Sequence, residues 1–315
     1  MIPFFKLIRW PNLLIIGLTQ YLLRYLVIKP MLDLSDIELQ LSHFDFFLLV
    51  LSTVLIAAAG YIINDYFDTK IDHVNRPGNV VVGIKIKRRV AIVCHLILSL
   101  IGIFLGFYVG YKAGVYKLGI IHFIVSGLLW FYSTDFKRQV FIGNFIVAVL
   151  AALVPLIVPL YEIPPLNYAY SNILIETGTN FNFLFYFPAG FAVFAFLVTL
   201  IREIIKDNED YKGDEAFGLT TLPVVYGIKR AKNIAIGLIL FTIVLLLILQ
   251  AWQLKNMDIT SFIYILLAVQ FPLLYLLFRL KEAGTSEEFH AASSLTKLIM
   301  LLGILYTTVI FFILK

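Results

Sequence analysis

Long apolar stretches alternate with short polar segments along the whole chain. Nine of these stretches contain no Asp, Glu, Lys or Arg, and most have the roughly 17–25 residues that a helix needs to cross a bilayer. Because only helices and closed barrels satisfy their backbone hydrogen bonds in lipid, the pattern predicts an all-α integral membrane protein with nine transmembrane helices. The expected spans are residues 11–23, 46–64, 90–111, 118–134, 139–161, 177–201, 233–254, 259–278 and 298–314.

The first span is short, but apolar residues continue beyond Arg24. We expect the long side chain of Arg24 to reach towards a membrane interface. Residues 1–23 show no small-residue cleavage site after their apolar run, so we expect a retained first helix rather than a signal peptide.

Composition agrees with a membrane protein. Of the 315 residues, 61% are hydrophobic and 14% are charged, whereas soluble domains have about 45–50% and about 25%. If the N-terminus lies in the cytoplasm, 19 of the 25 Lys and Arg residues fall on the cytoplasmic side, which is the positive-inside signal. The net charge of +5 therefore indicates a cytoplasmic face against anionic lipid rather than nucleic-acid binding. We expect a multi-pass protein of the cell inner (plasma) membrane.

Cysteine and histidine contribute no recognisable site. The single cysteine, Cys94, excludes an intramolecular disulfide. The five histidines show no spacing that is typical of a zinc site.

Two acidic motifs with identical spacing interrupt this apolar chain. The first triplet is Asp65, Asp68 and Asp72, and the second triplet is Asp207, Asp210 and Asp214. They end the second and sixth predicted helices, and because four crossings separate them, both must emerge on the same face. We therefore expect a single domain over residues 1–315, with the two triplets in same-facing polar segments at 64–89 and 202–232.

If the helices continue through the triplets, the spacing of the acids indicates what they could bind. Offsets of 0, 3 and 7 residues then fall within about a 60° arc, so each triplet presents its carboxylates on one stripe. Facing carboxylates repel unless cations lie between them, and oxygen ligands together with substrate phosphates suit Mg²⁺. The pattern predicts a magnesium-bound diphosphate carried on a lipid.

Basic and amide side chains near the triplets are candidates for the diphosphate. They are Asn12, Arg76, Lys137, Arg202 and Lys206, and Asn64 is a neutral oxygen ligand or amide donor before the first triplet. Topology-setting charges are an alternative explanation for the basic residues. Packing hydrogen bonds are an alternative explanation for Asn12.

These residues resemble the UbiA-type intramembrane prenyltransferases over nearly the whole chain. The family's two motifs are similar to NDYFDTKIDHVNRP (64–77) and to DNEDYKGD (207–214) with the following GLTTLP (218–223). The start of its first helix is similar to RWPN (9–12), and the turn between its fourth and fifth helices is similar to YS…FKR…GN (132–144). The resemblance implies nine helices around a central cavity open to lipid, and Mg²⁺-dependent prenyl transfer at the cytoplasmic side.

The resemblance also implies roles for individual residues. Asn64, Asp68 and Asp72 would hold one metal, and Asp210 and Asp214 the other. Asp65 and Asp207 would stand beside the metals in catalytic support, Arg76 and Lys137 would grip the diphosphate, and Glu203 would orient the acceptor or act as its base. Two features depart from the family. Tyr132 lies five residues before Lys137 instead of four, and the segment after Arg76 lacks a second basic residue.

The sequence leaves more than one candidate for the acceptor. Residues 202–223 most resemble the branch that prenylates geranylgeranylglyceryl phosphate, a small lipid. An aromatic acceptor of quinone biosynthesis (hydroxybenzoate or naphthoate) is the close alternative, and a tetrapyrrole is a distant one. A cation transporter is a hypothesis from another class, because intramembrane acidic residues often mark ion paths. Transporters built from inverted repeats place their sites near the midplane, however, whereas these triplets lie at helix ends in same-facing copies.

Overall fold

The structure is a computed structural model that describes every residue except 1, 76, 77 and 79. Across the described residues, nine helical spans are long and apolar enough to cross a membrane. Their number matches the prediction from the hydrophobic pattern. The spans are Trp10–Asp33, His43–Asn75, Arg88–Lys112, Tyr116–Thr134, Ile142–Ala169, Phe181–Ala216, Ile228–Lys255, Ile259–Glu282 and Ser286–Leu314.

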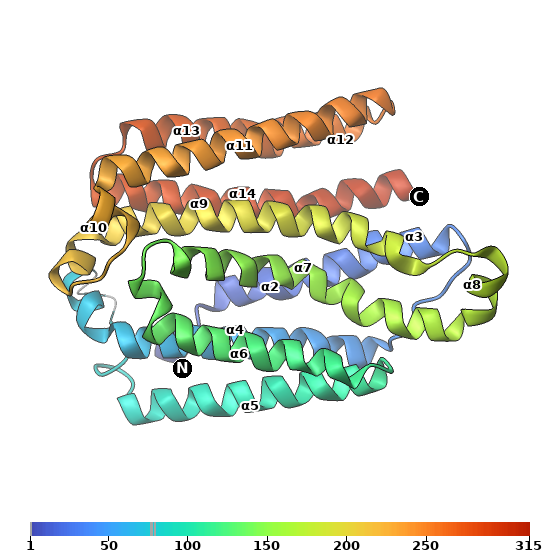
Figure 1. Cartoon of the computed structure of the whole chain (residues 1–315), viewed down its shortest axis with the longest axis horizontal. Coiled ribbons are helices and arrows are strands. Elements are labelled where there is room, and N and C mark those ends of the chain that lie inside the picture. The colour runs from blue at the N-terminus through green and yellow to red at the C-terminus, as the bar shows by residue number, and fades with distance from the viewer. Residues whose placement is uncertain (1, 76–77, 79) are drawn as a thin grey trace. The chain divides into compact units, whose positions relative to one another are not determined.

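Regular structure in the described part of the chain is helical, apart from one isolated bridge between Val82 and Ile86. The elements (Figure 1) are α1 Ile2–Leu7, α2 Trp10–Leu23, η1 Arg24–Ile28, α3 Lys29–Asp33, α4 His43–Asn75, α5 Arg88–Lys112, η2 Tyr116–Leu118, α6 Gly119–Thr134, η3 Phe136–Arg138, α7 Ile142–Ala169, α8 Ser171–Thr177, η4 Phe181–Phe185, α9 Tyr186–Ala216, α10 Leu222–Tyr226, α11 Ile228–Lys255, α12 Ile259–Tyr264, η5 Ile265–Gln270, α13 Phe271–Glu282 and α14 Ser286–Leu314.

Two of the spans contain a widened turn. The π-helical segments η1 and η5 are each followed by a proline at the second helical position, Pro30 in α3 and Pro272 in α13. Proline lacks the backbone N–H that the helical ladder needs, and a π-turn is one way for a helix to absorb that interruption. Both spans therefore continue through their prolines.

The chain forms two compact units. The first unit contains residues 1–135 and 153–190, and the second unit contains residues 136–152 and 191–315. In the first unit, α4 packs against α5 and α6 (Figure 1). Close approach of α4 and α5 depends on Gly102, because a Cβ there would lie 2.6 Å from Ile56 Cγ1. The Ser52 hydroxyl donates a hydrogen bond of 2.7 Å to the Gly102 carbonyl at the same contact.

Arg24 corrects a prediction. Its side chain does not reach an interface but is fully buried in the first unit, where Nε lies 2.6 Å from Glu162 Oε1. The guanidinium stands 4.3 Å from the centre of the Phe46 ring and donates to the Leu41 carbonyl. A carboxylate that neutralises the charge, together with these partners, removes the need to reach water.

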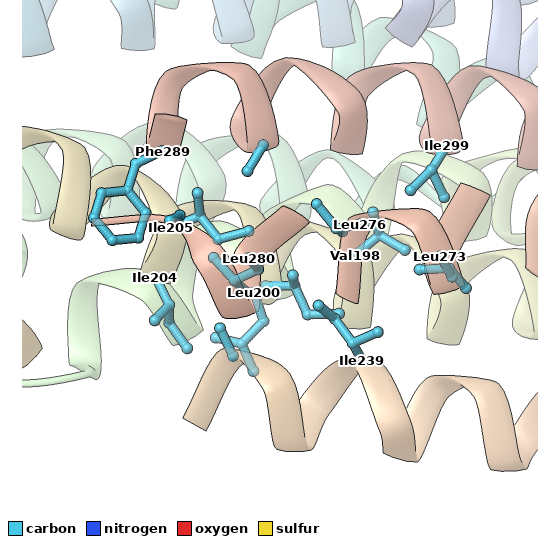
Figure 2. Close-up of a cluster of buried hydrophobic side chains, with 14 of the residues drawn as sticks. Val198, Leu200, Ile204, Ile205, Ile239, Leu273, Leu276, Leu280, Phe289 and Ile299 are labelled. Atoms are coloured by element: carbon cyan, nitrogen blue, oxygen red, sulfur yellow. The ribbon is translucent and has the colours of Figure 1, made fainter. Parts of the chain in front are cut away.

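The core of the second unit forms where α9, α11, α13 and α14 meet, as Figure 2 shows. Helix α9 contributes Val198, Leu200, Ile204 and Ile205. At 100° per residue these side chains cover one side of α9, and Arg202, Glu203, Lys206 and Asp210 lie on the other. Packing of the apolar side therefore turns the charged side away from this core.

Both acidic triplets lie on helices rather than in loops. Helix α4 continues to Asn75 and helix α9 continues to Ala216, beyond the predicted span ends at 64 and 201. Each triplet therefore lies on a continuous helix, which is the condition under which its three carboxylates share one face. In the segment between α4 and α5, Val81 and Val82 are buried and pack against Leu7 and Ile62.

Candidate active site

The first triplet occupies the last three turns of α4, where all three carboxylates are half-buried. Arg9, which precedes α2, donates a hydrogen bond of 2.8 Å from Nη2 to Asp65 Oδ1. The Arg9 guanidinium also lies 4.9 Å from the centre of the Tyr61 ring. Asn12 donates to the Tyr61 hydroxyl over 3.2 Å. The start of α2 is therefore fixed to the face of α4 that carries the triplet.

The second triplet has a corresponding partner. Asn144, a buried residue in the first turn of α7, donates a hydrogen bond of 2.8 Å from Nδ2 to Asp207 Oδ2. In each unit, therefore, the first acid of the triplet accepts a hydrogen bond from a residue at the start of another spanning helix. Sequence reasoning did not assign a role to Arg9 or Asn144, although both lie in segments that carry the family resemblance.

The two helix starts share a backbone feature. Arg9 has φ 51° and Phe141 has φ 66°, and each directly precedes the first residue of its helix, α2 or α7. Left-handed backbone is uncommon for residues other than glycine. Its occurrence at both positions shows that each helix starts after a sharp change of chain direction. The residue that holds the acid is Arg9 itself before α2, and Asn144 three residues after Phe141 in α7.

Lys137 lies in the short turn η3, before α7 and in the same unit as the second triplet. A Cβ on Gly143 would come 2.8 Å from Lys137 Cα, so only glycine lets η3 fold this closely over α7. Thr220 donates to the Arg138 carbonyl through both its backbone N–H, at 3.0 Å, and its hydroxyl. The segment after α9 therefore holds the turn that carries Lys137.

Glu203 forms an ionic group with two basic residues of α9, Arg202 and Lys206. Arg202 Nη1 lies 2.5 Å from Glu203 Oε1, and Lys206 Nζ lies 3.6 Å from Glu203 Oε2. The sequence predicted these cations as diphosphate ligands and Glu203 as an acceptor residue. The structure brings the three together on one helix.

The outer side of α9 is held by the start of α14. His290 Nδ1 lies 2.9 Å from Glu209 Oε1, and the Ser286 hydroxyl donates to the Glu209 backbone carbonyl. Thr285 and Glu288 form a capping box that starts α14. Sequence reasoning missed this contact, which fixes the turn of α9 between Asp207 and Asp210.

The predicted metal ligands are suited to Mg²⁺ in their chemistry. Asp68 and Asp72 are four residues apart on α4, as are Asp210 and Asp214 on α9, so each pair shares a helix face. No group of three His, Cys, Asp or Glu in the described part of the chain could hold a metal. Mg²⁺ commonly binds through one or two carboxylates together with substrate phosphates, which is the kind of ligand set that each pair offers.

Several predictions about the site remain untested. The first triplet belongs to the first unit and the second triplet to the second unit, so their meeting in a shared pocket stays a prediction. Asn64 is half-buried on α4 before Asp65. Arg76, the predicted diphosphate ligand after the first triplet, lies outside the described residues.

Comparison with known proteins defines the class of this chain. The sequence model of the UbiA prenyltransferase family matches residues 38–311. The chain therefore belongs to the UbiA prenyltransferase family, which confirms the resemblance, and its predicted class is that of a prenyltransferase enzyme in a multi-pass membrane fold.

Individual relatives narrow the comparison. A digeranylgeranylglyceryl phosphate synthase of Methanosphaera stadtmanae is 31% identical over 255 residues, which cover 80% of this chain and 83% of the relative. A solved structure from work on digeranylgeranylglyceryl phosphate synthase in membranes has a TM-score of 0.61 at 24% identity, over 97% of this chain and 98% of that one. A UbiA homologue from Archaeoglobus fulgidus, bound to DMAPP and Mg²⁺, has a TM-score of 0.54 at 17% identity, over 97% and 99%. Both solved structures share the fold.

Proposed function

We propose that this protein transfers a geranylgeranyl group from its diphosphate to geranylgeranylglyceryl phosphate, with Mg²⁺ as cofactor. The observation that carries this proposal is the pair of acid triplets on the last turns of α4 and α9, each with its first acid held from a neighbouring helix start. The relative from Methanosphaera stadtmanae, which is named for this product and matches 80% of the chain, supports the choice of acceptor.

The carboxylate pairs of the two triplets would serve the donor. Mg²⁺ bound by Asp68 and Asp72 with Asn64, and by Asp210 and Asp214, would neutralise the diphosphate as it leaves. Arg76 and Lys137 would add cationic contacts to the same group. Stabilisation of charge on a leaving group is worth most where water is excluded.

Asp65 and Asp207 would support this arrangement without binding metal directly. Each accepts a hydrogen bond from the protein, Asp65 from Arg9 and Asp207 from Asn144. Such contacts orient the helix turn that carries the other two acids of each triplet. We expect these residues to affect the affinity for Mg²⁺ and the rate, because partners behind metal ligands orient the ligands themselves.

The acceptor hydroxyl would capture the allylic carbon near Glu203. The carbon–oxygen bond to the diphosphate breaks, a new ether bond forms to the acceptor oxygen, and the hydroxyl proton passes to the Glu203 carboxylate. Glu203 is buried and held by Arg202 and Lys206, so its position is defined before an acceptor arrives.

We place the reaction at the cytoplasmic side of the cell inner membrane. The positive-inside distribution supports this orientation, with 19 of 25 basic residues on the side where both triplets emerge.

The test uses the purified full chain in lipid nanodiscs, with Mg²⁺, geranylgeranyl diphosphate and a panel of acceptors. The panel contains geranylgeranylglyceryl phosphate, 4-hydroxybenzoate and a dihydroxynaphthoate, and mass spectrometry identifies the product. We expect prenylation of the glyceryl phosphate lipid, dependent on Mg²⁺ and abolished by EDTA. Prenylation of an aromatic acceptor alone would overturn the assignment of the acceptor, and absence of any product would overturn the proposed activity.

A further inference from the structure

Helix α9 places an ionic group at the end of a long apolar run. No charged residue occurs between 177 and 201, and Arg202, Glu203 and Lys206 then follow within five positions. Their side chains are only 16%, 10% and 20% exposed. Charges that are shielded from water to this extent need partners.

The Glu203 carboxylate contacts both cations. Its Oε1 lies 2.5 Å from Arg202 Nη1, and its Oε2 lies 3.6 Å from Lys206 Nζ. The next carboxylate along the helix, Asp207, accepts the Asn144 amide at 2.8 Å and also lies close enough to Lys206 to interact with its charge. Arg202 Nε is buried and has no hydrogen-bond partner among the residues that the structure describes. The Arg202 guanidinium therefore has a buried donor to offer to an anion.

A buried hydroxyl lies one turn earlier on the same side of the helix. Thr199 is 4% exposed, and its Oγ1 likewise has no hydrogen-bond partner within the described ranges. Thr199 precedes Glu203 by four residues, so the two side chains are neighbours on the helix surface. The ligand that suits this face is therefore an anion that also carries neutral polar oxygens.

The distance along α9 separates this group from the predicted metal ligands. At 1.5 Å per residue, Lys206 precedes Asp210 by about 6 Å and Arg202 precedes it by about 12 Å, both towards the apolar end. A diphosphate held by metal at Asp210 and Asp214 places its prenyl carbon on that apolar side. An anion bound at Arg202 and Lys206 thus belongs to the second substrate, next to the carbon under attack.

We propose that Arg202 and Lys206 bind the phosphate monoester of the acceptor lipid, and that they are not ligands of the donor diphosphate. This rests on the proposed function and refines it. The acceptor phosphate replaces Glu203 as the partner of the two cations, and the released carboxylate accepts the hydrogen bond of the nearby acceptor hydroxyl. When the ether bond forms, that carboxylate takes the hydroxyl proton while the diphosphate leaves with the electron pair of its carbon–oxygen bond.

The experiment compares two acceptors that differ only in the phosphate, geranylgeranylglyceryl phosphate and geranylgeranylglycerol. The full chain and its Arg202→Gln and Lys206→Gln variants are assayed in nanodiscs, and KM is measured for each acceptor and for the donor. A hydrogen bond to a charged group contributes roughly 1.5–3 kcal/mol, so we expect each variant to raise KM for the phosphorylated acceptor at least about tenfold. The donor KM should stay within about twofold of wild type, and KM for geranylgeranylglycerol should change much less than KM for the phosphorylated acceptor, since neither interaction involves the acceptor phosphate.

Two further variants serve as controls. Arg202→Lys keeps the charge and should retain most of the preference for the phosphorylated acceptor. Lys212→Gln removes an exposed cation from the opposite side of α9 and should change neither KM. Thermal denaturation in nanodiscs reports whether each variant is folded.

Three results would contradict the inference. A higher KM for the donor with an unchanged KM for the acceptor would indicate that Arg202 and Lys206 bind the donor diphosphate instead. Equal losses of activity on both acceptors would indicate that Arg202 and Lys206 support the structure and do not bind the acceptor phosphate. If the wild-type protein prenylates no glyceryl lipid, the proposed function fails first and this inference fails with it, a result that the acceptor panel distinguishes.

Discussion

Asp65 and Asp207 occupy the same position in their triplets and are held in the same way. A guanidinium holds one and a carboxamide holds the other, in both cases from the start of another spanning helix. The two contacts bridge 56 and 63 residues, so helical periodicity could not reveal them. Periodicity did reveal the stripe of acids itself, since that pattern is local to one helix.

The hydrogen bond from Asn144 gives the first prediction. Asn144→Ala removes the donor to Asp207, and we expect the Mg²⁺ concentration for half-maximal activity to rise about 10–100-fold. A titration of activity with Mg²⁺ measures this change. Asn256→Ala, which removes an exposed amide at the end of α11, is the control and should leave the titration unchanged. An unaltered Mg²⁺ dependence in Asn144→Ala would show that this contact only packs the helices.

The second prediction concerns the proposed metal ligands. Asp68→Asn and Asp210→Asn keep the size of each side chain but remove its charge, and we expect each to lower turnover at least about 100-fold through loss of metal-assisted charge stabilisation. Thermal denaturation should show a folded protein in both cases. Wild-type turnover in either variant would remove that residue from the proposed site.

At the scale of elements, glycine at 143 explains how a three-residue turn stays close to a helix start. The turn η3 carries Lys137, and the Thr220 contacts fix it from its other side. The sequence identified Lys137 as a candidate because it is basic and lies beside a motif. The backbone contact that holds Lys137 could not be predicted, since it depends on the path of the chain after α9.

The third prediction follows from this close contact. Gly143→Ala adds a Cβ that would lie 2.8 Å from Lys137 Cα and 3.0 Å from the Phe136 carbonyl oxygen, so η3 must shift. We expect KM for the prenyl diphosphate to rise about tenfold, the loss of one charge-assisted contact. Steady-state kinetics with varied donor measure it. Gly237→Ala in α11, where a Cβ meets nothing within 4 Å, should leave the donor KM unchanged.

At the scale of the whole molecule, the apolar pattern predicted the number of membrane spans because hydropathy is summed over about twenty residues and tolerates local exceptions. Arg24 was such an exception. The prediction ended the first span at residue 23, whereas the helix continues past Arg24 to Asp33. The burial of the Arg24 charge was not predicted either, because its partner Glu162 lies on α7, far along the chain. The predicted meeting of the two triplets also depends on tertiary arrangement, which local patterns do not contain.

The buried pair of Arg24 and Glu162 gives the fourth prediction. Glu162→Gln leaves the guanidinium buried without its counter-charge, and we expect a loss of about 3–5 kcal/mol of stability. Thermal or denaturant unfolding in detergent measures the change. The double variant Arg24→Met with Glu162→Leu should recover a large part of the loss, because no unpaired charge remains. A double variant as unstable as the single one would show that packing, not charge, sets the effect.

Helix α9 has two faces with different roles along its length. Val198, Leu200, Ile204 and Ile205 anchor it to the second unit's core, while Thr199, Glu203 and Lys206, which we propose serve the acceptor, lie on its other flank. We expect substitutions on that flank to leave the anchor intact. Under the proposed function, a lineage with this construction can exchange these residues and so acquire a different acceptor, while the direction in which the helix presents them is inherited unchanged.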